Sequence, residues 1–171
     1  KTAFLADACK NLSAKRWRGI PDGAAVYSLA RGLNANKIPA PLWIVTPTEQ
    51  EAEKLVLGFQ FWLKNLPVFL YPQDDPRTFD GASGAPNVIQ QRIVAMDAIY
   101  QNRQCVVVSS AFGSLHRCLS QQDFQSLCLS IAVNQQINPE ELREHLQKQG
   151  YLFSSILDEQ GLFFWRGDTL R

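Results

Sequence analysis

The chain has 171 residues, of which 46% are hydrophobic and 19% are charged, and its formal net charge is +1. This length and apolar content allow a buried core in one domain, or in one domain with a small second lobe. The near-neutral charge argues against a dedicated nucleic-acid or membrane-surface binder, since these usually carry a basic excess, and no apolar run reaches the ~20 residues of a membrane span.

Alternating strand and helix patterns fill the first two thirds of the chain. Short, continuously apolar runs predict three buried strands, at 42–46, 68–71 and 105–109. Helical patterns lie before, between and after them, at 2–12, 24–33, 49–63, 87–100 and 111–119. Capping boxes that begin at Thr48 and Asn87 mark two of the helix starts. This alternation predicts an α/β fold, a parallel sheet with flanking helices.

The pattern changes near residue 125. We predict a strand at 127–133, then a helix from the Asn138 cap to Gly150. Two strand-like runs follow, at 151–157 and 162–170, and the turn between them predicts a hairpin. The chain therefore divides into an α/β domain over 1–124 and a small α+β domain over 125–171. Because the sequence ends at Arg171, directly after the strand-like run 162–170, we expect the second domain to be truncated.

The cysteines and histidines predict no metal site. The four cysteines form no Cys-x-x-Cys pair, and the two histidines lie far apart. Isolated cysteines within apolar runs are typical of buried, reduced thiols. We therefore expect a cytoplasmic protein without structural zinc.

The glycine-rich turn that begins at Gly19 lies where a nucleotide-binding domain would carry its phosphate loop. In the pattern Gly-x-x-x-x-Gly-Lys-Ser/Thr, read from Gly19, Gly23 is the last variable position. The second glycine, the lysine and the hydroxyl residue are replaced by Ala24, Ala25 and Val26. These changes remove the cation for the phosphates and the hydroxyl that holds Mg²⁺, which argues against nucleotide hydrolysis. The pattern alone fits an ordinary turn better than a decayed phosphate loop.

Several segments, in order and spacing, resemble the N-terminal region of the bacterial transcription-repair coupling factor family. These segments are 19–30, 42–53, 87–93, 106–108, 115–119, 141–151 and 161–168. The last of them, which ends in Trp-Arg-Gly-Asp, also resembles a strand of the excision-repair protein UvrB. The short connection from Tyr71 to Asn87 and the altered phosphate loop fit the coupling factor better than UvrB.

The resemblance implies a degenerate P-loop NTPase-like domain followed by a docking domain. In this family the N-terminal module mimics UvrB and binds the protein UvrA through the small second domain. RNA polymerase and DNA are partners only of other parts of the full-length protein, which contain its ATP-driven translocase. We therefore expect a non-catalytic docking module of transcription-coupled nucleotide excision repair, without a cofactor.

Two alternatives remain open at this point. The chain could be the N-terminal part of an active ATP-dependent repair helicase of the UvrB type, which the altered phosphate loop argues against. It could also be a structural lobe that contacts only the rest of its own protein. We find no nucleophile and base at the spacing of a catalytic motif.

The resemblance places the UvrA contact around the Arg-Gly strand, where Arg166 matches the family. Leu152 and Phe164 stand at positions where family members or UvrB-like sequences carry arginine. Strand alternation predicts Phe164 and Arg166 on one face, with Phe163 and Trp165 on the other. An arginine beside an aromatic residue is typical of an interface anchor, although Arg166 could equally be a solvated strand residue.

Overall fold

The computed structural model describes residues 19–73, 86–115, 117–157, 161–167 and 169–170. The predicted helix at 2–12 lies outside these residues. Internal contacts divide the described residues into two units, the first holding 19–73 and 88–115 and the second holding 86–87 and 117–170. The predicted border between residues 124 and 125 stays a prediction, because contacts alone do not show which residues fold independently.

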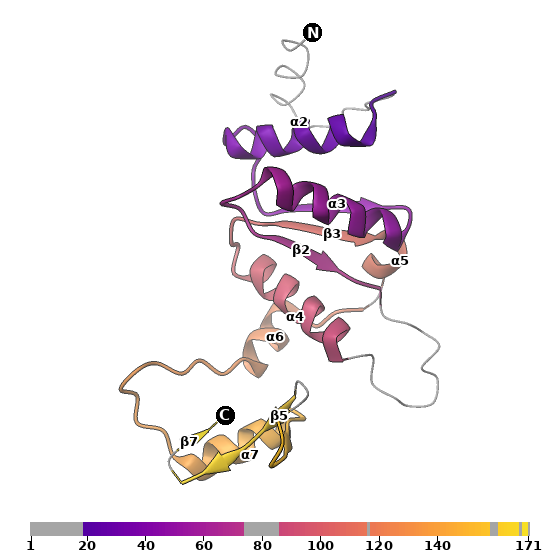
Figure 1. Ribbon diagram of the computed structural model, residues 1–171. Coiled ribbons are helices and arrows are strands. Elements are labelled where there is room, and N and C mark those ends of the chain that lie inside the picture. Colours follow the sequence, from indigo (N-terminus) through magenta and orange to yellow (C-terminus); the bar gives the residue numbers. More distant parts are fainter. Residues whose placement is uncertain (1–18, 74–85, 116, 158–160, 168, 171) are drawn as a thin grey trace. The chain divides into compact units, whose positions relative to one another are not determined.

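Three parallel strands form the sheet of the first unit (Figure 1). The edge strands are β1 (Leu42–Thr46) and β2 (Val68–Tyr71), and β3 (Val106–Ser110) lies between them. Every residue of β3 is buried, as expected for a central strand that is covered on both faces. The predicted parallel α/β sheet is therefore confirmed, with β3 starting one residue later than predicted.

Helices cover both faces of this sheet. Helices α2 (Asp22–Asn34) and α3 (Glu49–Trp62) pack against each other on one face, and α4 (Pro86–Tyr100) covers the other (Figure 1). The side chain of Thr48 accepts a hydrogen bond from the backbone N–H of Glu51 at 3.3 Å. This bond confirms the predicted cap, since it satisfies an N–H that the helix itself leaves free.

The core beneath α2 and α3 consists largely of apolar residues that recur at helical spacing in these two helices. Its buried members are Val26, Ala30, Leu33, Ile38, Ala52, Val56, Phe59, Leu63, Val106 and Val108. Burial of such a cluster is the main favourable contribution to folding. It holds α2 and α3 at fixed positions over the sheet and so shapes the surface between them.

Helix α4 differs from its prediction in two respects. It begins at Pro86, so that Asn87 lies in its first turn instead of capping it. Its buried residues include Ala95 and Ala98, whereas Ile93 is 49% exposed, although the helical spacing of Ile89, Ile93, Met96 and Tyr100 predicts that these residues share the buried face. Small alanine side chains let a helix lie close to its neighbour. The face of α4 that is buried is therefore the one with the alanines and not the one with the largest apolar residues.

The predicted helix at 111–119 ends early. Helix α5 (Ala111–Ser114) is a single turn, and Ser120 caps a separate helix, α6 (Gln121–Leu127). The Ser120 hydroxyl accepts a hydrogen bond from the N–H of Asp123 at 3.2 Å. A serine followed by an acidic residue at this spacing starts a new helix instead of continuing the old one.

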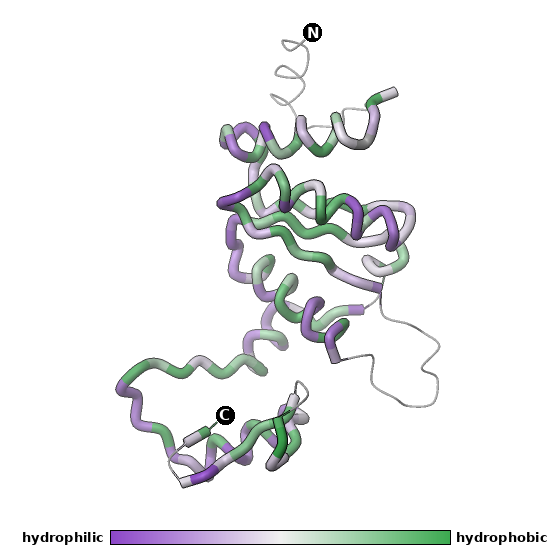
Figure 2. Tube along the Cα trace, viewed as in Figure 1, coloured by the Kyte–Doolittle hydropathy of each residue, from purple (hydrophilic) through white to green (hydrophobic). Residues whose placement is uncertain are grey.

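The predicted strand at 127–133 is wrong for the described structure. Leu127 ends α6, and the stretch that follows it is largely hydrophobic (Figure 2) but forms no strand before α7 (Figure 1). Its apolar side chains are exposed, and Val133 reaches 92%. An alternating sequence forms a strand only where another strand offers a free edge. In the described part of the second unit, no strand pairs with this stretch.

Helix α7 (Pro139–Lys148) confirms the prediction for this region. Its cap Asn138 accepts a hydrogen bond from the N–H of Glu140 at 3.0 Å. The chain leaves the helix through Gly150, whose φ of +89° is a conformation that favours glycine. Among the described helices, none combines the length and hydrophobicity of a membrane span.

The predicted hairpin between 151–157 and 162–170 is wrong. Strands β4 (Leu152–Phe153) and β5 (Leu162–Phe163) pair in parallel. The hydroxyl of Ser154 accepts from the N–H of Ile156 at 3.2 Å and donates to the Ile156 carbonyl at 2.6 Å. This local turn ends the first run after two residues of strand, because Ser side chains compete with the strand for backbone groups.

The second run is also divided. Strands β6 (Trp165–Arg166) and β7 (Thr169–Leu170) pair in antiparallel fashion. Gly167, with φ of +58°, follows β6 and lets the chain reverse direction there. The chain therefore reverses direction within this run, which does not form one continuous strand.

Candidate functional site

A groove of about 570 Å³ opens between α2, β1 and α3 in the first unit; we call it the α2–α3 groove. Its apolar lining includes Leu29, Ile44, Leu55 and Phe59, and Lys54 and Glu51 contribute charged groups. Thr46 and Pro47, at the carboxyl end of β1, also line it. Open α/β sheets commonly bind ligands at this end of their strands.

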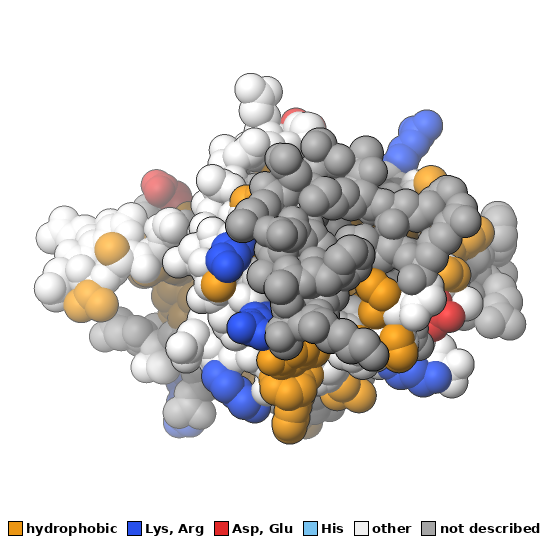
Figure 3. Space-filling view, turned by 90° about the horizontal axis from the view of Figure 1, so that it is seen from above, with side chains coloured by type: hydrophobic (Ala, Val, Ile, Leu, Met, Phe, Trp, Pro, Cys, Tyr) orange, Lys and Arg blue, Asp and Glu red, His pale blue; other side chains and the backbone are white. Residues whose placement is uncertain are grey.

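Aromatic side chains lie beside this groove on the surface. The rings of Tyr27 and Trp62 are 4.8 Å apart, and those of Trp62 and Phe61 are 5.0 Å apart. The exposed fractions of Tyr27, Trp62 and Phe61 are 40%, 44% and 65%. Viewed from the top of Figure 1, the molecule shows hydrophobic side chains gathered next to Lys and Arg side chains (Figure 3).

The predicted phosphate-loop residues lie at the start of α2. Gly19, with φ of +67°, precedes the helix, whereas Gly23 lies in its first turn, so the predicted turn over 19–23 ends earlier, at Pro21. The N–H groups of Ala24 and Ala25 donate to the Pro21 carbonyl at 2.9 and 3.1 Å. They are thus engaged within the helix, unlike the N–H groups that a phosphate-binding loop directs at its ligand.

Val26, which the sequence pattern aligned with the Mg²⁺-binding hydroxyl residue, contributes to the core. It is 6% exposed, and a Cβ added to Gly58 of α3 would lie 3.2 Å from its Cγ1 atom. The absence of a side chain at Gly58 therefore lets α3 approach α2 closely at Val26. Ala25 lines the groove without a charge, and the lysine at the groove, Lys54, comes from α3 instead of from the loop.

A polar network at the carboxyl ends of the strands was not predicted from the sequence. The indole N–H of Trp43 donates to the Ser109 hydroxyl at 2.8 Å, and the Thr46 hydroxyl donates to the Ser109 carbonyl at 3.2 Å. Ser109 and Thr46 are buried, so these bonds satisfy groups that would otherwise lose their hydration. The network joins β1 to β3 at the carboxyl ends of these strands. Its polar groups lie there in place of the apolar side chains that form the core.

Arg92 of α4 holds the end of β2. Its guanidinium donates to the Pro72 carbonyl at 2.8 Å and to the Tyr71 hydroxyl at 2.7 Å. It also lies 4.1 Å from the centre of the Tyr71 ring, which is a favourable cation–π distance. The signal for it was present in the sequence, because Arg92 lies within one of the segments that resemble the coupling factor family.

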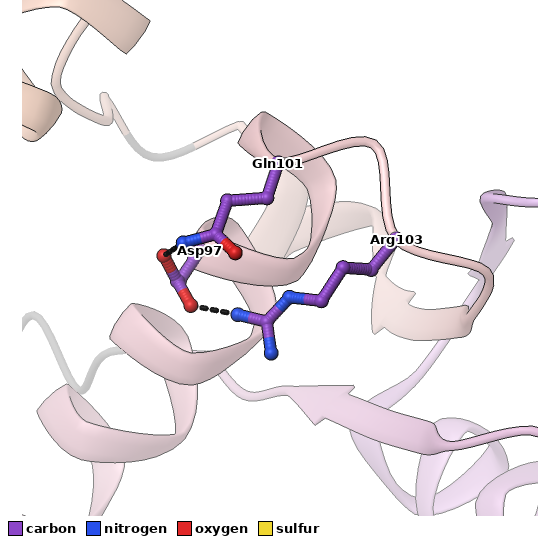
Figure 4. Close-up of polar contacts among 3 residues, drawn as sticks. All are labelled: Asp97, Gln101 and Arg103. Atoms are coloured by element: carbon purple, nitrogen blue, oxygen red, sulfur yellow. Dashed lines mark hydrogen bonds and ion pairs between the residues drawn. The ribbon is translucent and has the colours of Figure 1, made fainter.

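A second charged network fixes the turn between α4 and β3. Asp97 accepts hydrogen bonds from Gln101, at 2.7 Å, and from Arg103 (Figure 4). Arg103 in turn lies near Cys105, where burial raises the pKa of the thiol and the guanidinium lowers it by a smaller amount. Within the described residues, no group of His, Cys, Asp and Glu side chains could hold a metal ion.

The three predicted partner-binding residues all lie in the second unit. Leu152 is in β4 and is 66% exposed, Arg166 is in β6 and exposed, and Phe164 is half-buried between β5 and β6. Because Phe164 belongs to neither strand, strand alternation does not place it on the same face as Arg166. The structure therefore does not support the predicted sharing of a face.

A cluster of aromatic rings lies beside the three predicted partner-binding residues in the second unit and includes one of them, Phe164. The ring of Phe153 lies 5.8 Å from that of Phe163 and 6.1 Å from that of Phe164. The Arg143 guanidinium of α7 lies 5.7 Å from the Phe153 ring. Phe163 is 3% exposed and forms the core of this unit together with Leu142. Phe153 remains half exposed and so links that core to the surface.

The segment 151–157 carries exposed apolar residues, of which the sequence singled out only Leu152. They are Tyr151, Leu152, Phe153, Ile156 and Leu157, with exposed fractions between 42% and 67%. Exposed apolar surface of this kind marks sites of protein interaction more often than it serves a monomer. The predicted strand pattern concealed it, since a longer strand would have buried alternate residues.

No protein-family model matches the chain. It is 26% identical to the transcription-repair-coupling factor of Myxococcus xanthus over 162 residues, which cover 91% of this chain and 13% of that protein. It is 24% identical to UvrABC system protein B of Fervidobacterium nodosum over 165 residues, covering 89% of this chain and 24% of the relative. The coupling factor of Bacillus subtilis is 25% identical over 137 residues, or 80% and 12% of the two chains.

The chain is similar to transcription-repair-coupling factors and to UvrABC system protein B. The resemblance that the sequence motifs predicted is thereby confirmed. The chain spans about a quarter or less of the length of these relatives, so their activities as whole proteins need not belong to it.

Proposed function

We propose that the chain is a docking module of transcription-coupled nucleotide excision repair that recruits UvrA through its second unit. One observation carries this proposal: similarity to two kinds of repair protein extends over 80–91% of the chain. A region that a coupling factor and UvrB both contain is suited to bind a partner that both proteins use. UvrA is the partner that the family resemblance implies.

The surface of the second unit supports such a role. Leu152 and Arg166 are exposed, and the apolar segment 151–157 lies on the same unit. Aromatic residues and arginine are enriched in protein interfaces, where they anchor the contact. A leucine in place of an arginine at 152 would replace a charged contact by an apolar one.

The first unit supports a role without nucleotide hydrolysis. The N–H groups of Ala24 and Ala25 are used within α2, and Val26 is packed in the core. We therefore propose that this region is a degenerate phosphate loop, and that DNA and RNA polymerase bind to other parts of a longer protein. Burial was predicted for the thiols of Cys105 and Cys128, and the prediction is correct for Cys105 but wrong for Cys128, which is exposed. We propose a location in the reducing cytoplasm from the cysteine pattern of the sequence.

The proposal is tested by titrating purified UvrA with the chain and with its Arg166→Ala variant by isothermal calorimetry. Loss of an interface anchor worth about 2 kcal/mol would weaken binding about 30-fold. Arg31→Ala is the matched control, since Arg31 is an exposed arginine in the first unit and its loss should leave UvrA affinity unchanged. Failure of the unmutated chain to bind UvrA would contradict the proposal.

A titration with Mg²⁺-ATP distinguishes this role from that of an active UvrB-type helicase. We expect no saturable binding at micromolar concentrations, because the cation and the hydroxyl of a working loop are missing. Micromolar affinity would overturn the interpretation of the loop and favour the enzymatic alternative.

A further inference from the structure

A second groove on the first unit follows the free edge of strand β2; we call it the β2-edge groove. Its volume is about 650 Å³, and residues of α3, β2 and α4 line it. Helix α3 forms one wall and α4 forms the other, as expected for helices that cover opposite faces of the sheet (Figure 1). It is distinct from the α2–α3 groove, because the two grooves share no lining residue.

The backbone of β2 offers hydrogen-bonding groups to this groove. The Pro67 carbonyl accepts a hydrogen bond from the N–H of Val106 at 2.9 Å, so Pro67 directs its backbone toward β3. Alternate residues of a parallel strand bond to the same neighbour, and the N–H and C=O groups of Val68 and Leu70 therefore point away from β3. No other strand of the described residues pairs with this side of β2. Such an open row of backbone groups is a template for one further strand.

The open edge of β2 is short and has a defined end. Beyond Leu70, the next residue in the alternation is Pro72, which has no N–H to donate. Its carbonyl accepts a hydrogen bond from the Arg92 guanidinium at 2.8 Å. The edge therefore offers the backbone groups of Val68 and Leu70, which match a partner segment of about three to five residues.

Apolar side chains lie on both walls of the groove. Leu57 of α3 is 68% exposed, and Val94 of α4 is 41% exposed. Successive side chains of an added strand point to opposite faces of the sheet. One apolar residue of a partner strand would thus meet Leu57 and its neighbour would meet Val94, which adds side-chain contacts to the backbone bonds.

Glu53 is the charged residue among those that line the groove. It is exposed, and it forms no ion pair with any described residue. The other polar side chains of the lining are the neutral Gln60, Gln90 and Gln91. Glu53 and Leu57 lie about one helical turn apart, a rise of ~6 Å, and alternate residues of a strand are separated by ~6.6 Å. A basic residue two positions from the one at Leu57 would therefore reach the Glu53 carboxylate.

We propose that the β2-edge groove binds an extended segment of another protein, which adds a strand to β2. The segment carries apolar residues at neighbouring positions and a lysine or arginine two positions from one of them. A second copy of this chain lacks that charge complementarity, because no lysine or arginine lines its own groove. The inference concerns the first unit and does not depend on the binding of UvrA by the second.

NMR measurements on the whole chain test the proposal. In the free chain, we expect the amides of Val68 and Leu70 to exchange faster than those of Phe69 and Tyr71, which face β3. The probe is the capped peptide Thr-Val-Val-Arg-Val-Val-Thr, whose symmetric order fits the edge in either strand direction. Its addition should shift the amide signals of 53–60, 68–71 and 90–94 saturably and slow the exchange of Val68 and Leu70.

Two further comparisons separate strand addition from a general apolar contact. N-methylation of the three central peptide residues removes their N–H donors but keeps their side chains, and it should abolish binding. Glu53→Lys should weaken binding of the arginine peptide about three-fold and strengthen binding of the same peptide with glutamate in place of arginine by a similar factor. The matched control is Glu51→Lys, on the same helix but in the α2–α3 groove, which should leave both affinities unchanged.

The proposal is overturned if the peptide gives no saturable shifts at ~1 mM, a concentration that detects weak binding. Equal binding of the N-methylated peptide, or equal effects of Glu53→Lys and Glu51→Lys, would also overturn it. So would slow exchange of Val68 and Leu70 in the free chain. In that case, slowing that increases with protein concentration would identify a second copy as the occupant, and slowing that does not would show that the edge is covered within the chain.

Discussion

Two phenylalanines of α3 differ sharply in how far their side chains are buried. Phe59 is fully buried in the core, whereas Phe61, two residues later, is 65% exposed and contacts the ring of Trp62. The contribution of a side chain to stability follows from the apolar area that it removes from water and from the cavity that its loss creates.

We therefore expect Phe59→Ala to lower the free energy of unfolding of the first unit by about 3–5 kcal/mol. Phe61→Ala in the same helix should change it by less than about 1 kcal/mol, because the side chain is largely hydrated in the native state. Urea unfolding of both variants, monitored by circular dichroism, measures the difference. Equal losses for the two variants would show that the core assignment of α3 is wrong.

Cys105 predicts a dependence of stability on alkaline pH. Since burial raises the pKa of its thiol above the ordinary value, the folded chain keeps this proton at a pH where the unfolded chain has lost it. The resulting stability is fully present below the ordinary thiol pKa and is lost as the pH rises through the raised pKa. The free energy of unfolding should thus fall less steeply between pH 7 and pH 10 in Cys105→Ala than in the unmutated chain. An identical slope in both proteins would contradict this assignment.

At the scale of whole elements, local capping interactions set the starts of the helices. Thr48 caps α3 with a bond to the N–H of Glu51, and the acidic Glu49 and Glu51 in the first turn favour the helix dipole. The same principle explains α6 and α7, whose caps are Ser120 and Asn138. Because a cap acts on residues only two or three positions away, it operates independently of the rest of the fold.

Replacement of the α3 cap should therefore have a moderate and specific effect. We expect Thr48→Ala to destabilise the first unit by about 1 kcal/mol, since one N–H at the start of α3 loses its partner. Thr48→Ser, which retains the hydroxyl, should remain within a few tenths of a kcal/mol of the unmutated chain. Urea midpoints for the three proteins provide the comparison, and a loss in Thr48→Ser as large as that in Thr48→Ala would exclude capping as the cause.

At the scale of the whole molecule, the two units differ in the size of their cores. The first unit buries a cluster drawn from α2, α3 and the sheet, whereas the buried apolar residues of the second unit, among those described, are Leu142 and Phe163. A core this small leaves little reserve of stability. The proposed UvrA-binding surface therefore lies on the unit with the smaller core and the lower expected stability.

Phe163→Ala should accordingly remove the slow hydrogen exchange of α7 while leaving that of α3 and β3 unchanged. The physical reason is that Phe163 contacts Phe153 within the second unit and is one of the buried apolar residues there, so its loss opens that unit. Mass-spectrometric hydrogen exchange resolves the two units. Equal loss of protection in α3 would show that the units unfold together.

Local patterns in the sequence predicted the sheet and most of the helices of the first unit. The strand at 42–46, the strand at 68–71 and the Thr48 cap lie where they were expected. A short, continuously apolar run favours a strand that is buried on both faces, and a capping bond depends on neighbours in sequence. The departures of Ala24, Ala25 and Val26 from the phosphate-loop pattern are visible directly in the sequence, whereas their interpretation as a degenerate phosphate loop stays a prediction.

Contacts between residues that are distant in the sequence decided the features that local patterns did not predict. Residues 127–133 have the composition of a strand but find no pairing edge in the described structure, and the Ser154 turn ends β4 after Phe153. The α2–α3 groove depends on how closely α3 approaches Val26 at Gly58, which no local pattern reveals. The sequence by itself determined the kind of fold and the family resemblance, because these depend on local periodicity and on residue identity. Only the tertiary structure decided which apolar side chains remain exposed, since exposure depends on the partners that the folded chain supplies.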